Sequence, residues 1–143
     1  MSAPLMPQPR HEAGSRMKLA ASLAVAVARL ISFLPPAVIS MVLRLVCCGT
    51  LPAEAAEVSK WRNAVNVVSK RCAGKGCLQR SVAVMLLGGM ARRTPVWCTG
   101  FQTTPFLAHA WVEVAGVPID EPEQVSGYHR AVVVGPRRRG EPR

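Results

Sequence analysis

The strongest constraint on the fold is a change of hydrophobic period near Pro95. Before it, apolar residues recur at helical spacing, as at Val58, Trp61, Val65 and Val68. After it the pattern alternates, most clearly in FLAHAWVEV over residues 106–114. Helices followed by strands predict an α+β fold, with N-terminal helices and then an antiparallel β-meander.

The expected helices cover residues 17–34, 36–48, 52–71 and 77–91, and the expected strands cover residues 96–101, 106–114, 117–120 and 128–134. A length of 143 residues indicates one domain. We divide the chain into a disordered basic arm (1–16), an N-terminal apolar helical hairpin (17–51), a core (52–134) and a basic tail (135–143).

The apolar stretch over residues 19–48 is the one segment that resembles a membrane span. Arg29, the Pro35-Pro36 pair and Arg44 interrupt it, and a transmembrane helix needs about 20 predominantly apolar residues. We therefore favour two helices that cover a core or a partner, and expect no stable membrane insertion. A signal peptide or membrane anchor is the less favoured alternative.

The number of cysteines indicates the cellular compartment, and the net charge indicates which classes of partner the protein could bind. Five cysteines are an odd number, which favours free thiols in a reducing cytoplasm over a secreted disulfide framework. The formal net charge of +10 is compatible with acidic partners or nucleic acid. The basic residues cluster at Arg92-Arg93 and at residues 137–139 and do not follow one helix, and aromatics make up only 5% of the chain. We therefore expect a solvated basic face and no nucleic-acid binding.

Cys77 is the candidate nucleophile. It follows Gly-Lys-Gly and opens the helix expected over residues 77–91. A helix N-terminus has free backbone N–H groups and a positive dipole end, which favour a thiolate and provide donors for an oxyanion. Gly76 and Leu78, which flank the cysteine, are expected to shape the site. The alternative is a structural cysteine at a helix start.

His109 is the candidate base, and the predicted hairpin brings an acid near it. If Ala115-Gly116 forms a two-residue loop, His109, Trp111 and Glu113 share one face of the strand, and Trp111 also shapes the site. The same register makes Asp120 the diagonal neighbour of His109, about 7–8 Å away between backbones. A register slip of one residue would replace Asp120 by Glu121.

A zinc site is an alternative use of the same residue types. Zinc accepts four nitrogen or sulfur ligands, which Cys72, Cys77, Cys98 and His109 provide. The Cys72-x₄-Cys77 spacing is unusual for zinc, and the sequence has no second closely spaced pair of ligands. We therefore expect no metal and no cofactor.

The segments RCAGKGCLQRS (71–81), PVWCTGF (95–101) and PFLAHAWVEV (105–114) resemble the lasso peptide leader peptidases. These are small bacterial transglutaminase-like cysteine proteases, and the resemblance to their stand-alone form covers roughly residues 20–134. It implies a papain-like or transglutaminase-like fold with Cys77 as nucleophile, His109 as base and Asp120 as acid.

The resemblance also implies a function and partners. Such an enzyme removes the leader from a ribosomally made lasso precursor peptide. A small leader-recognition protein delivers the precursor, and an ATP-dependent cyclase similar to asparagine synthetase closes the macrolactam ring. We assign the helices over residues 17–48, with Leu30, Phe33 and Leu34, to docking one of these partners.

Overall fold

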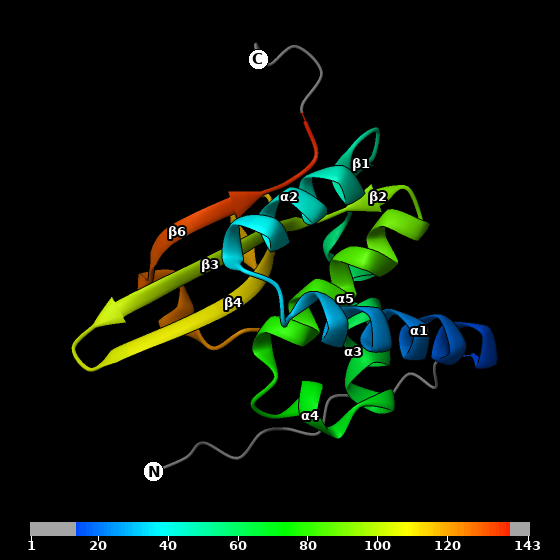
Figure 1. The fold of residues 1–143 in the computed structure, drawn as a ribbon, viewed down its shortest axis with the longest axis horizontal. Coiled ribbons are helices and arrows are strands. Elements are labelled where there is room, and N and C mark those ends of the chain that lie inside the picture. The colour runs from blue at the N-terminus through cyan, green and yellow to red at the C-terminus, as the bar shows by residue number, and fades with distance from the viewer. Residues whose placement is uncertain (1–13, 138–143) are drawn as a thin grey trace.

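The computed structural model describes residues 14–137 and has a helical half packed on a β-sheet (Figure 1). The helices are α1 (Ser15–Ile31), α2 (Pro36–Cys47), α3 (Ala55–Val68), α4 (Lys70–Ala73) and α5 (Cys77–Met90). The main sheet contains β3 (Val96–Thr103), β4 (Phe106–Val114), β5 (Val117–Pro118) and β6 (His129–Val134), and a 3₁₀ helix, η1 (Glu123–Gly127), precedes β6. The predicted α+β fold, with helices before an antiparallel sheet, is confirmed.

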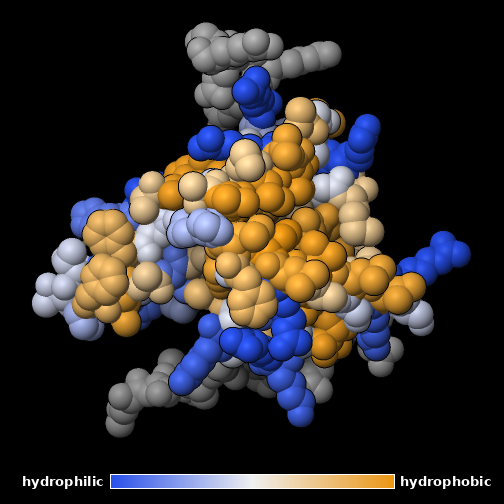
Figure 2. Space-filling model, in the orientation of Figure 1, coloured by the Kyte–Doolittle hydropathy of each residue, from blue (hydrophilic) through white to orange (hydrophobic). Residues whose placement is uncertain are grey.

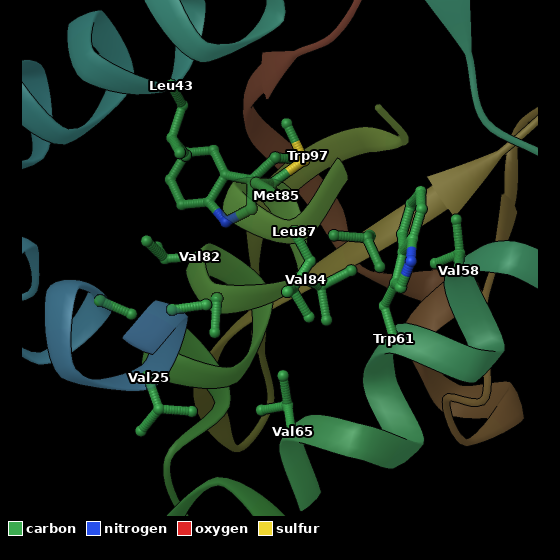
Figure 3. Packing of buried hydrophobic residues seen from close by; sticks show 14 of the residues in the cluster. Val25, Leu43, Val58, Trp61, Val65, Val82, Val84, Met85, Leu87 and Trp97 are labelled. Atoms are coloured by element: carbon green, nitrogen blue, oxygen red, sulfur yellow. The ribbon is translucent and has the colours of Figure 1, made fainter. Parts of the chain in front are cut away.

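Helix α5 is the centre of the core. Val82, Ala83, Val84 and Met85 are consecutive and have no exposed surface, so this helix is apolar on all sides and must be surrounded. Helices α1, α2 and α3 and strand β4 pack around it (Figure 3). The Trp97 indole N–H donates to the Ser81 hydroxyl at 3.0 Å, which links α5 to β3.

Helices α1 and α2 both cover the core, and each packs on a different pair of elements. Helix α1 packs on α5 and α3, whereas α2 packs on α5 and β6. The face that α1 buries includes Ala21, Ala24 and Ala28, whose small side chains let the backbones of α1 and α5 approach closely. Both helices therefore turn their buried faces to the core and leave apolar side chains in solvent, and these form the large patch over α1 and α2 in Figure 2.

The helix expected over residues 52–71 is divided at Ser69. Helix α3 begins after a capping box formed by Glu54 and Glu57 and ends at Val68. Ser69 adopts an extended backbone, and its hydroxyl accepts a hydrogen bond from the Cys72 amide at 3.3 Å, which caps α4. This second short helix turns the chain toward the start of α5.

The sheet has the strand order β5-β4-β3-β6, and all neighbours are antiparallel. The predicted hairpin register is confirmed, because Val114 pairs with Val117 and Glu113 with Pro118. Strand β5 is shorter than expected and ends at Pro118. The sequence analysis missed a parallel pair of two-residue strands, β1 (Leu51–Pro52) and β2 (Arg93–Thr94).

The chain ends fall largely outside the described residues. The predicted arm over residues 1–16 overlaps them only at 14–16, and Ser15 and Arg16 belong to α1. Most of the tail predicted over residues 135–143 also lies outside. Within residues 14–137, no helix combines the length and apolar character that a bilayer crossing requires.

Candidate active site

Cys77 is the first residue of α5, as predicted, and it is partly exposed. Gly76 precedes it, and the Gly76 amide donates to the Arg71 carbonyl at 2.8 Å. A Cβ atom at Gly76 would lie 2.7 Å from that same oxygen, so this close approach requires glycine. The turn holds the cysteine at the N-terminal end of a buried helix.

His109 lies on β4 and contacts Cys77 on one side and a carboxylate on the other. The imidazole shares a side-chain hydrogen bond with Cys77, and its Nε2 lies 2.9 Å from Oε2 of Glu121. Because Nε2 faces the carboxylate, Nδ1 is the ring nitrogen left for the thiol. Cys77, His109 and Glu121 thus form a continuous chain from nucleophile to base to acid.

The charged forms of Cys77 and His109 stabilise each other. The hydrogen bond to His109 lowers the pKa of Cys77 in spite of partial burial, and the backbone of Ala110 and the positive charges of His109 and Arg80 add to this effect. Hydrogen bonds to Cys77 and Glu121 raise the pKa of His109 to about 9. Each group thus favours the charged form of the other, and the thiolate is the reactive form of a cysteine nucleophile.

Asp120 does not contact His109, so its predicted role as the acid is wrong. Its carboxylate accepts a hydrogen bond from the Ser59 hydroxyl at 2.6 Å on the exposed side of α3. The register around the hairpin was right, but β5 has already ended and Asp120 has a φ of +52°. This left-handed conformation ends the alternation of side chains and turns Glu121 toward His109.

Glu121 is held by two arginines as well as by His109. Arg62 of α3 and Arg80 of α5 each donate to its Oε1 at 3.4 Å, and its side chain is only 4% exposed. Burial alone would raise the pKa of Glu121, but the bond from His109 and the charges of Arg62, His109 and Arg80 hold it below its usual value. Arg80 also donates to the Cys72 carbonyl at 2.9 Å, which links α4 to the acid.

A family model described as the transglutaminase-like superfamily matches residues 21–133, a range that contains all three residues. The chain belongs to the transglutaminase-like superfamily. The match covers well over half of the sequence and agrees with the observed order of helices and antiparallel strands. No curated protein and no solved structure matches the chain.

In this transglutaminase-like chain, Trp111 supports the His109 ring. The two rings stack at 6.0 Å between centroids with 14° between their planes, and Tyr128 meets both rings edge-on. The Trp111 indole N–H donates to Glu113 at 2.8 Å. The predicted common face of His109, Trp111 and Glu113 is thereby confirmed. A Cβ at Gly100 would lie 2.7 Å from the Trp111 ring, so glycine leaves the space that the indole fills.

Cys98, on β3, is poorly placed to act as a second nucleophile. It is fully buried, and burial together with the charge of Glu113 raises the pKa of Cys98 to about 12. Within residues 14–137, no group of three or more His, Cys, Asp or Glu side chains is arranged to hold a metal ion. The ligand set of the zinc alternative is thus not assembled there.

The Cys77–His109 pair lies between two hollows. A cleft of about 700 Å³, the His109 cleft, is lined by His109, Glu121, Arg80 and Tyr128 among others. A second cleft of about 350 Å³, the Cys77 cleft, is lined by Arg29, Ser32, Phe33, Arg71, Lys75, Gly76, Cys77, Leu78 and Gln79. Gly76 and Leu78, the two residues predicted to shape the site, both line the Cys77 cleft.

The sequence analysis missed Arg62 and Arg80. Arg80 lies in CLQRS, three residues after Cys77, so on helical spacing it points to the same side of α5. That spacing was an available signal, whereas nothing local to Arg62 indicated its distant partner Glu121.

Proposed function

We propose that this protein is a cysteine peptidase in which Cys77 is the nucleophile, His109 the general acid and base, and Glu121 the residue that orients the imidazole. The observation that supports it most is the continuous hydrogen-bonded chain from Cys77 through His109 to the buried Glu121. Superfamily membership supports it independently.

The reaction follows from this geometry. The Cys77 sulfur attacks the scissile carbonyl carbon, and backbone N–H groups at the start of α5 are available to the resulting oxyanion. His109 gives its Nδ1 proton to the leaving amine as the C–N bond breaks. Water then attacks the thioester, His109 accepts the water proton, and the acid product leaves as the thiolate is restored.

The substrate we propose is the leader of a ribosomally made lasso precursor peptide. The resemblance of residues 20–134 to the lasso leader peptidases supports this choice. A small leader-recognition protein and an asparagine-synthetase-like cyclase would then be the partners. The exposed apolar side chains of Leu30 (70% exposed), Phe33 (85%) and Leu34 (39%) suit docking of the leader-recognition protein, and Phe33 also lines the Cys77 cleft.

The test is leader removal followed by mass spectrometry, with a candidate precursor and leader-recognition protein encoded beside this gene. Cys77→Ala should abolish cleavage, whereas Cys48→Ala, at an exposed cysteine outside both clefts, should cleave like the wild type. Cleavage retained by Cys77→Ala would refute the peptidase assignment. Cleavage of unrelated peptides but not of precursors would refute only the substrate.

A further inference from the structure

The two clefts differ sharply in charge. The His109 cleft is lined by Arg62, Arg80 and His109 but also by Asp120 and Glu121, so acidic side chains offset most of its positive charge. The Cys77 cleft is lined by Arg29, Arg71 and Lys75 and by no acidic residue. Figure 2 shows hydrophilic side chains gathered below the α1–α2 apolar patch, toward the position of α4 in Figure 1.

The three cations of the Cys77 cleft come from different elements, and none of them is paired with an acidic side chain of residues 14–137. Arg29 lies in the last turn of α1, Arg71 in α4, and Lys75 in the turn before α5. Within residues 14–137, none of the three forms an ion pair, whereas Glu54, Glu57, Glu113 and Glu121 are all paired with other arginines. Their positive charge is therefore available to a ligand.

A second, independent feature of the cleft points to a peptide. The side-chain oxygen of Gln79 is buried and has no hydrogen-bond partner among the described residues. A buried acceptor without a donor is costly, and a rotation of the partly exposed Gln79 side chain into the cleft would let a backbone N–H of a bound peptide satisfy it. Phe33 and Leu78 add apolar surface for the aliphatic part of a side chain.

Resting on the proposed peptidase function, we propose that the Cys77 cleft selects substrates with a carboxylate within one or two residues of the scissile bond. Arg29, Arg71 and Lys75 act as specificity determinants: they attract the carboxylate and take no part in bond breaking. An acidic side chain and a peptide C-terminus both supply this group.

The first arm of the test compares two small alkylating reagents of similar size on the full chain, at low salt. Iodoacetate is an anion and iodoacetamide is neutral, and with each the Cys77 sulfur forms a C–S bond as iodide leaves. The measured quantity is the rate of Cys77 modification by iodoacetate divided by the rate with iodoacetamide. Lys75→Gln and Arg29→Gln should each lower this ratio by roughly twofold, because each removes one nearby positive charge. The double variant should lower it further. The rate with iodoacetamide should hardly change.

Lys60→Gln is the matched control, since Lys60 is an exposed cation on α3 outside both clefts. An unchanged ratio in the double variant, or an equal fall in the Lys60 variant, would overturn the inference. A different failure would concern the peptidase itself: iodoacetamide would then modify Cys77 no faster than the exposed Cys48.

The second arm measures how short peptides protect Cys77 from iodoacetamide at equal ionic strength. The probes are acetyl-Gly-Glu-Gly-amide, acetyl-Gly-Gln-Gly-amide and acetyl-Gly-Gly-Gly with a free C-terminus. Stronger protection by the glutamate peptide than by the glutamine peptide, lost in the Arg29/Lys75 double variant, supports an acidic side chain. Protection by the free C-terminus alone identifies a chain end as the ligand, and equal protection by all three overturns the inference.

Discussion

Replacing Glu121 with glutamine should impair Cys77 while keeping the shape of the side chain. The carboxylate accepts from His109 Nε2 at 2.9 Å and is only 4% exposed, so the lost interaction is a buried hydrogen bond between charged groups. Such bonds contribute about 1.5–3 kcal/mol. At about 1.4 kcal/mol per factor of ten, cleavage should fall roughly 10- to 100-fold.

The pH dependence of the same variant gives a sharper test. Glu121 helps to raise the pKa of His109 to about 9, so its neutral replacement should lower that pKa and make the imidazolium a weaker partner for the thiolate. The pKa of Cys77 should then rise. Iodoacetamide modification, measured by mass from pH 4 to 10, should show the thiolate appearing at higher pH than in the wild type.

Asp120→Asn is the matched control, because Asp120 contacts Ser59 and not His109. It should change the rate less than twofold and leave the pH profile in place. Thermal melts should accompany both variants, since Glu121→Gln also removes the anion that Arg62 and Arg80 contact. An unshifted profile in folded Glu121→Gln, or a larger loss in Asp120→Asn, would refute the assignment of the acid.

The remaining predictions concern pH and packing. The rate of peptide cleavage should rise with pH through the lowered pKa of Cys77 and fall above about pH 9, where the His109 imidazolium loses its proton. The rate of Cys77 alkylation should not fall there, because alkylation needs no proton donor. A cleavage rate that still rises at pH 10 would contradict the Cys77–His109 ion pair. Gly100→Ala should destabilise the fold by about 1–3 kcal/mol in urea titrations, because the new Cβ would lie 2.5 Å from a backbone oxygen, whereas Gly127→Ala has open space around it and should be nearly neutral. Leu43→Ala, at a fully buried position of α2, should lower the free energy of unfolding by about 2–5 kcal/mol. Leu45→Ala, at a position of the same helix that is 71% exposed, should change it by no more than about 0.5 kcal/mol. Similar losses in the two variants would show that α2 does not bury the face that contains Leu43.

Local patterns predicted the elements well where one period dominates. The alternation of residues 106–114 matches β4 in both bounds, and the Gly-Lys-Gly signal placed the start of α5 at Cys77. The hairpin register also followed from two residues, Ala115 and Gly116. These features depend on neighbours in the sequence, which is why the sequence alone was sufficient.

The sequence-based predictions fail where the position of a residue or element depends on a single backbone torsion or on a partner that is distant in the sequence. The positive φ of Asp120 changes which carboxylate reaches His109, and aspartate is one of the few residues that tolerate this conformation, so the sequence was compatible with either outcome. The break at Ser69 depends on one hydroxyl-to-amide bond. The placement of α1 and α2 on α5 likewise depends on long-range packing that periodicity does not encode.

The position of Glu121 has a consequence for when the thiol becomes reactive. Its carboxylate is reached by Arg62 from α3, Arg80 from α5 and His109 from β4, so these parts of the chain must dock before the charges meet. In an unfolded or partly assembled chain, Cys77 would keep the weak nucleophilicity of an ordinary thiol. Completion of folding would thus act as the activation step, and a newly made chain would not attack peptides before its own domain is finished.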